Sequence, residues 1–537
     1  MFRVIFVVTI LVAIGVCASG QYAHKLMVKD GRLEGLVDLL NSRESRILFQ
    51  NWKGNLNDST AFLKILEPWI LHDSAVQLIS RSPVEEAPLD CANPLYSSAL
   101  SGATLEKQRL IVDFVPFGYD VEKLLVRFYE TAAYVDVFVI YEMPYTLLGN
   151  PKPLFFNRIR DQPRFRSFLN KVIYVNSDMA EMQLALDETR QAISRFYSRT
   201  KMDFNSVDNG VKMGSFGQSG KSEHLEPAMY AVMRFFNKDL MVQFKRIGTF
   251  APSNDVERHN ERLKGTLMAH IKSGGQVFAI QNDGDEFVNG KVLRHLRSCA
   301  LHSEVKSVFT PCFGFKNNYN WLQTTFDMRH FTSGQKSTRD IVDVYKYLQT
   351  AVFGRFVGKS LQMELNQFIW RLGPFLWPLQ TVMDADSMLR RNFTQDRFFS
   401  HHMGYGAATH MSAVNEPVEL WYKACGTVEM VGTCERSVPL RLRQAAAIGN
   451  VTAKLVYDST VFPWCHRWNK VVHVSTLSKR ARRVVLDSIP WVVRNNPTAF
   501  PFMVPSPGLR TTGLFERVAD PLWALECESL HAGLIDT

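Results

Sequence analysis

Residues 276–286 read QVFAIQNDGDE, an apolar run that leads directly into a cluster of acidic residues. The segment VFAI (277–280) has the length and composition of a fully buried strand, which in α/β proteins usually lies inside a parallel sheet. Open sheets of this kind bind their ligands in the crevice outside the carboxyl ends of the strands. The sequence therefore predicts an α/β protein whose site lies where this strand ends.

Asp283 and Asp285 are two positions apart, so on an extended chain their carboxylates point the same way and can share one hard cation. Gly284 between them lets a ligand approach closely. Mg²⁺ or Mn²⁺ carrying a nucleotide diphosphate is the usual cation for one or two protein carboxylates. The same tripeptide is common in loops and helix caps, and Glu286 either orients the metal ligands or is a solvated helix residue. From these residues alone, both interpretations stay open.

The chain of 537 residues is 46% hydrophobic and 12% aromatic, enough for a large core in one or two domains. Its net charge is +10, but the basic residues are scattered among acidic ones rather than gathered in one stripe. We therefore expect no nucleic-acid partner.

The N-terminus predicts entry into the secretory pathway. Arg3 precedes an apolar stretch from Val4 to Ala18, so residues 1–22 read as a signal peptide or a signal anchor. Residues 23–105 read as a stem or an N-terminal elaboration. In a lumenal chain one or more disulfides are allowed, Cys425 and Cys434 being the closest pair in sequence.

Residues 106–537 read as the main domain. Apolar runs at 110–115, 135–141 and 171–175 predict strands, and an amphipathic run at 121–128 predicts a helix, which together give a βαβ start. Further helices are expected at 256–273 and 291–301, and one strand at 305–315. Residues 177–254 fit no simple pattern and are interpreted as an insertion.

A longer segment carries a family resemblance. Residues 126–156, VRFYETAAYVDVFVIYEMPYTLLGNPKPLFF, resemble the opening of glycosyltransferase family 17, the β-1,4-mannosyl-glycoprotein 4-β-N-acetylglucosaminyltransferases. The similarity resumes at Glu261-Arg262, continues through QNDGDEF, and reappears at GAATHMS (406–412) and PWVVRNNPTAF (490–500). Thr409 and Met411 depart from the Trp and Cys of the family pattern. The matching residues of the first segment are Arg127, Glu130, Asp136, Glu142, Thr146, Gly149, Pro151, Pro153, Leu154 and Phe156.

The resemblance implies a GT-A type, Rossmann-like nucleotide-sugar fold with a mostly parallel sheet, a UDP-GlcNAc donor, a glycan acceptor on a glycoprotein and inversion at the anomeric carbon. It also implies a Golgi enzyme that is anchored in the membrane through its N-terminus, or secreted if the leader is cut. The implied metal ligands for Mn²⁺ or Mg²⁺ are Asp283, Asp285 and His410. The implied donor contacts are Glu142, Asp136, Asp283 and Arg262.

Each of these residues also has a structural interpretation. Asp136 can pair with Arg127 inside the fold, Arg262 can form an ion pair on a helix surface, and His410 can be structural. The catalytic base cannot be assigned; Asp327, Asp384 and Asp386 lie in the right stretch. Two other functions remain in competition: a transferase that uses another UDP-sugar, and a glycan-binding relative without turnover.

Overall fold

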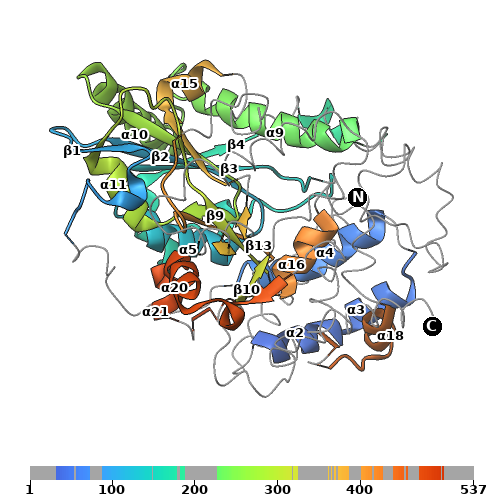
Figure 1. The fold of residues 1–537 in the computed structure, drawn as a ribbon. Helices are drawn as coiled ribbons and strands as arrows, with labels where there is room; N and C mark the ends of the chain where they lie inside the picture. Colours follow the sequence, from blue (N-terminus) through green and yellow to red (C-terminus); the bar gives the residue numbers. More distant parts are fainter. Residues whose placement is uncertain are drawn as a thin grey trace.

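The computed structural model describes residues 32–323, 361–385, 401–456 and 471–503, with gaps inside these ranges of which the longest are 73–87, 192–225 and 427–439. The expected leader at 1–22 lies outside the described residues. The protein is an α/β structure built around two six-stranded sheets, shown in Figure 1.

The first sheet contains four of the five strands that the sequence predicts, those expected at 110–115, 135–141, 171–175 and 277–280. Its strand order is β4-β3-β2-β5-β12-β8, and the first four strands run parallel to one another. At one edge β12 is added antiparallel to β5, and β8 pairs antiparallel with β12. The strands are β2 (Leu110–Phe117), β3 (Val137–Glu142), β4 (Val172–Asn176), β5 (Val277–Gln281), β8 (Val308–Phe309) and β12 (Phe375–Pro378).

Helices cover both faces of this sheet, as Figure 1 shows. On β2, Val112 and Phe114 pack with the helices on one face, whereas Ile111 and Val115 pack with those on the other, as alternation along a strand requires. The predicted insertion is in part helix α9, which packs on β4. The first group of helices is α9 (Glu226–Arg246), α10 (Asp255–Lys272) and α15 (Leu379–Asp384), and the second includes α5 (Val121–Thr131) and α11 (Gly290–Ser298).

The second sheet receives the acidic segment. Its order is β14-β10-β9-β13-β6, with β11 also paired to β9. Because β6 follows β5 after only a short loop, the acidic residues lie where the chain passes from one sheet to the other. The strands are β6 (Glu286–Val288), β9 (Cys312–Lys316), β10 (Asn318–Gln323), β11 (Ile369–Trp370), β13 (Ala408–Ala413) and β14 (Val471–His473).

Two sequence predictions of single elements are wrong. The expected strand at 305–315 is two strands, β8 and β9, in different sheets. The break falls at Thr310 and Pro311, because Pro311 has no backbone N–H to donate. Thr310 donates both its N–H and its hydroxyl to the carbonyl of Pro374. The expected helix at 291–301 ends at Ser298, and the last three residues form β7 (Cys299–Leu301), which pairs with β1 (Leu100–Thr104).

The N-terminal helices belong to the same core. They are α2 (Arg32–Leu40), α3 (Arg43–Gln50) and α4 (Leu56–Ile70); α3 packs on α18 (Leu440–Ile448) and α4 on α16 (Pro417–Gly426). The rings of Phe62 and Trp421 lie 5.9 Å apart in this contact. The described part of 23–105 therefore packs against helices from residues 417–448.

Short elements complete the described chain. None of the described helices has the length and the apolar composition that crossing a membrane would need. The remaining elements are η2 (Pro94–Tyr96), α6 (Phe155–Ile159), α7 (Pro163–Arg166), η3 (Leu169–Lys171), η10 (Val474–Thr476), α20 (Lys479–Ser488) and α21 (Trp491–Asn495).

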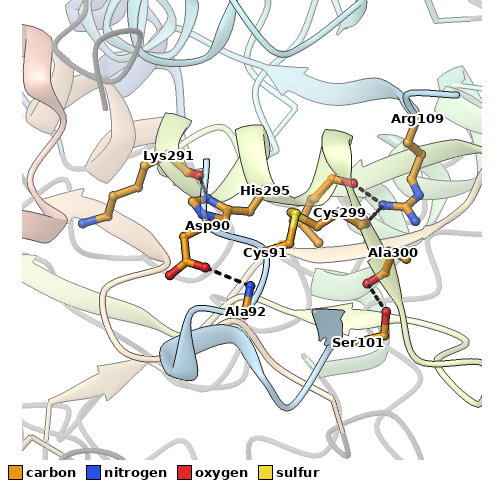
Figure 2. Close-up of a disulfide and its surroundings, with 10 residues drawn as sticks. Asp90, Cys91, Ala92, Ser101, Arg109, Lys291, His295, Cys299 and Ala300 are labelled. Atoms are coloured by element: carbon orange, nitrogen blue, oxygen red, sulfur yellow. Dashed lines mark hydrogen bonds between the residues drawn. A yellow bond between two sulfur atoms is a disulfide. The ribbon is translucent and has the colours of Figure 1, made fainter. Parts of the chain in front are cut away.

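A disulfide fastens the segment before β1 to β7. Cys91 and Cys299 are bonded across 208 positions of the sequence. Beside the bond, the guanidinium of Arg109 donates to the backbone carbonyl of Cys299 at 3.2 Å (Figure 2). Cys425 is also disulfide-bonded, and Cys434, its nearest neighbour in sequence, lies outside the described residues. Disulfides are typical of secreted and lumenal proteins. They agree with the expected secretory route.

We expect Cys91→Ser/Cys299→Ser to lower the free energy of unfolding by about 2–5 kcal/mol, because the bond closes a very long loop in the unfolded chain. The measurement is urea unfolding of the purified variant, with Cys312→Ser as a control for the same substitution at another buried cysteine. Equal urea midpoints for the double variant and the wild type would contradict a stabilising disulfide between Cys91 and Cys299.

Candidate functional site

The acidic loop lies at the carboxyl end of β5, next to the end of β2. The backbone N–H of Glu286 donates to the carbonyl of Asp283 at 3.1 Å, so the loop forms a tight turn. A side chain at Gly284 would place its Cβ 2.8 Å from the carbonyl oxygen of Pro116. A glycine is therefore needed at position 284 because the loop packs closely against the end of β2. This contact, and not room for a ligand, explains the glycine in this structure.

Arg127 of α5 binds the backbone of this loop through its side chain. The guanidinium is fully buried and donates to the carbonyl oxygens of Asp283 (2.8 Å), Gly284 (3.2 Å) and Glu286. These three bonds come from Nη2, whereas Nη1 donates to both carboxylate oxygens of Asp113, at 3.1 and 3.2 Å. One buried cation therefore fixes the backbone of the acidic loop and offsets the charge of an aspartate inside β2.

The structure corrects the expected partner of Arg127. Asp136 pairs with Arg297 at 3.0 Å and accepts from the backbone N–H of Ile111 at 2.8 Å. It precedes β3, so it lies at the amino end of the parallel strands, opposite to the acidic loop. Asp136 is therefore not brought together with the other candidate residues.

The carboxylate of Asp285 lies near basic side chains from three other elements, α16, β13 and α5. Its Oδ2 accepts from the Nζ of Lys423 on α16 at 2.8 Å, and its Oδ1 lies 3.9 Å from the Nε2 of His410 on β13. Burial opposes ionisation of Asp285, but the positive charges of Lys423, His410 and Lys123 lower its pKa well below the usual value. The carboxylate is therefore ionised at neutral pH.

His410 reaches this position through strand pairing. It lies opposite Glu286 in the antiparallel pair of β13 and β6, and the backbone N–H of Met411 donates to the carbonyl of Asp285 at 2.8 Å. The structure thus brings Asp285 and His410 together although they are 125 positions apart in the sequence. Asp283 lies at the start of the same turn, and its backbone N–H donates to the Glu286 carboxylate at 3.3 Å.

Glu142 is enclosed by protein groups. It ends β3 at the carboxyl edge of the sheet, and its side chain accepts from the Nζ of Lys152 (3.3 Å), from the N–H of Phe156 and from the hydroxyl of Tyr174 (3.1 Å). Burial raises its pKa, and Lys152 opposes that shift. The carboxylate holds the segment that follows β3, so the structural interpretation of Glu142 is favoured over donor contact.

Arg262 lies on the exposed side of α10, where its guanidinium is 3.1 Å from the Nδ1 of His259 one turn earlier. The structure places it on a helix surface and not among the acidic residues. Asp384, a candidate base, is exposed at the end of α15 and accepts from Gln380. Asp327 and Asp386 lie outside the described residues.

The expected metal ligands do not fit a divalent ion in this arrangement. Within the described part of the chain, no group of three or more His, Cys, Asp or Glu side chains is placed to hold a metal ion. A cation carried by a nucleotide diphosphate needs only one or two protein carboxylates, so the surroundings of Asp285 decide the fit. The carboxylate of Asp285 instead has an ammonium group at hydrogen-bonding distance. We therefore derive no chemical step through a metal.

Sequence reasoning missed Lys423, Lys123 and Glu419. Lys123 is fully buried on α5 and pairs with Asp120 at 3.0 Å, and Glu419 lies one turn before Lys423 on α16. One oxygen of Glu419 accepts from the N–H of Glu122 at 3.3 Å. The available signal was local: the run PVELWYKAC places two charged residues four apart on an otherwise apolar helix.

Glu419 gives a pH-dependent prediction. Burial and the negative charges of Asp120 and Glu122 raise its pKa to about 8. The folded state then holds a proton that the unfolded state releases, so this carboxyl lowers stability as the pH rises from about 4.5 to about 8. We expect Glu419→Gln to match the wild type in thermal unfolding at pH 5 and to be the more stable of the two at pH 8. If the unfolding temperatures of the two proteins differ by the same amount at pH 5 and at pH 8, the prediction is wrong.

Residues 95–215 match the family model of glycosyltransferase family 17. The resemblance predicted from the sequence is thereby confirmed, over a segment that contains β2, α5 and β3. Beta-1,4-mannosyl-glycoprotein 4-beta-N-acetylglucosaminyltransferases of Rattus norvegicus and Homo sapiens are each 33% identical over 73 residues. The match covers 14% of this chain and 14% of each relative. No solved structure matches the chain significantly.

Proposed function

We propose that the protein is a lumenal glycosyltransferase of the GT-A type that moves N-acetylglucosamine from UDP-GlcNAc to a mannose of a glycoprotein N-glycan, forming a β-1,4 linkage with inversion. The observation that carries the proposal is the family match over residues 95–215, because that segment supplies Arg127, which fixes the acidic loop. The named relatives support the choice of sugar and acceptor.

The arrangement of the site supports the reaction class. Asp285, His410 and Lys423 meet at the carboxyl end of the parallel strands, where α/β proteins bind nucleotides. Inverting transfer forms a bond from the acceptor oxygen to the anomeric carbon while the bond to UDP breaks. The leaving diphosphate gains negative charge, which fixed positive groups stabilise more in the transition state than in the ground state.

The proposed location follows from the N-terminal sequence and the disulfides. A signal anchor within residues 1–22 would place the rest of the chain in the Golgi lumen, and cleavage would release it. The Cys91–Cys299 bond supports an oxidising compartment.

A donor panel tests the proposal. The purified chain is incubated with a series of UDP-sugars, each with Mn²⁺ and with EDTA, and UDP release is measured with and without an N-glycan acceptor. Release from UDP-GlcNAc alone supports the proposal. Preference for another UDP-sugar selects the rival transferase, and glycan binding without release from any donor selects a relative that has lost turnover.

A further inference from the structure

The position where a divalent ion was expected contains a lysine. The Nζ of Lys423 is 2.8 Å from Asp285 Oδ2, and only 12% of the lysine side chain and 11% of the aspartate side chain are exposed. The ammonium occupies the hydrogen-bonding position of Oδ2, and a divalent ion bound to the same oxygen would face its positive charge at close range. The geometry therefore gives Asp285 a cation from the chain itself.

Lys423 is held in place by the packing of its helix. The neighbouring Trp421 is fully buried and contacts Phe62 of α4, and Val418 is also fully buried in the same core. The N-terminal helices thus support the helix that carries the lysine. Such support from packed helices is what a charged group needs to act without reorganisation.

The charges around the pair come from every neighbouring element. The basic groups are His410 on β13 and Lys123 on α5, which both lower the pKa of Asp285. The acidic groups are Asp120, which pairs with Lys123, and Glu419, whose raised pKa keeps it protonated at neutral pH. The positive charge beside Asp285 therefore comes from Lys423, His410 and Lys123, of which Lys123 also pairs with Asp120. Further carboxylates nearby are those of Asp283 and Glu286 in the same turn and of Glu122 beside Glu419.

We propose that the ammonium of Lys423, anchored by Asp285, neutralises the leaving nucleotide diphosphate in place of a divalent metal ion. The inference rests on the proposed function. The bond between the anomeric carbon and the diphosphate oxygen breaks, and its electron pair stays on the diphosphate. The acceptor oxygen bonds to the carbon, and its proton passes to solvent. Lys423 keeps its proton throughout and donates hydrogen bonds to the phosphate oxygens.

The first experiment uses Mn²⁺ alone as the probe and does not depend on turnover. Metal-stripped wild type and Asp285→Asn are titrated with Mn²⁺, with and without UDP, and free Mn²⁺ is followed by electron paramagnetic resonance. We expect the two proteins to titrate identically. A bound Mn²⁺ in the wild type that is lost in Asp285→Asn would overturn the proposal.

The second experiment measures UDP binding in EDTA by calorimetry. Lys423→Met alone leaves a buried aspartate without its cation, so Lys423→Met/Asp285→Asn is the variant of choice, and thermal unfolding verifies that it folds. We expect its affinity for UDP to fall at least about tenfold, as for a lost hydrogen bond to a charged group. Lys423→Arg should keep part of the affinity, and Lys272→Met, on the exposed end of α10, should keep all of it.

The outcomes separate the two proposals. If the wild type binds UDP in EDTA and the double variant binds it equally well, Lys423 has no part in donor binding although the proposed function stands. If the wild type binds UDP only with Mn²⁺, a metal takes the role assigned to the lysine. If the wild type binds no UDP in either buffer, the proposed function itself fails, and the inference fails with it.

Discussion

Under the proposed function, Asp285→Asn is expected to lower kcat/KM for sugar transfer from UDP-GlcNAc by about 10²–10³-fold, the loss typical of removing one preorganised electrostatic group. The carboxylate accepts from Lys423 at 2.8 Å and lies 3.9 Å from His410. An amide in its place leaves a largely buried ammonium without a counter-ion, and burial then favours the neutral amine. The site would lose both its anchor and the positive charge that the leaving diphosphate needs.

The measurement is the initial rate of UDP release with a saturating N-glycan acceptor at several donor concentrations. A loss mainly in kcat fits a role in the transition state, whereas a loss only in affinity fits ground-state binding. Asp255→Asn is the matched control, since the side chain of Asp255 is 94% exposed on α10 and should leave the rate unchanged. Wild-type activity in Asp285→Asn would remove this residue from the site.

The parallel part of the fold could be predicted from the sequence because its signals are local. The apolar runs that form β2, β3 and β5 are bounded by turn residues and alternate with amphipathic helices, and each strand lies within a few residues of its predicted place. The antiparallel strand β12 was not predicted. It has only four residues, and its pairing with β5 is a long-range contact that no local pattern specifies.

The site could be predicted only in part, for a related reason. Asp285 follows a strand whose end is visible in the sequence, and the family resemblance pointed to His410. Lys423 reaches Asp285 from 138 positions away, on a helix placed by packing against α4. A charge partner of this kind leaves no periodic signal. The same holds for Asp113, which lies inside an apolar strand and whose partner Arg127 only the structure identifies.

The pair formed by Asp113 and Arg127 carries the largest expected effect on stability. Arg127→Met would leave Asp113 buried in the sheet without its cation and would remove the donors to the carbonyls of the acidic loop. Breaking a buried pair by removing one partner typically costs about 3–5 kcal/mol. We expect a decrease of that size in the free energy of unfolding at pH 7, together with loss of activity.

The dependence on pH identifies the cause of this loss. Burial raises the pKa of Asp113, and Arg127 opposes that shift in the wild type. Without the arginine the folded-state pKa rises further, so the folded variant takes up a proton as the pH falls and its deficit relative to the wild type shrinks toward pH 5. Arg127→Met/Asp113→Asn removes both charges and should recover part of the stability at pH 7, which urea unfolding of the three proteins measures. If the single and double variants lose the same free energy of unfolding at every pH, the cost lies in packing alone and the charge pair contributes nothing. A cavity left by the arginine would respond neither to substitution nor to protonation of Asp113.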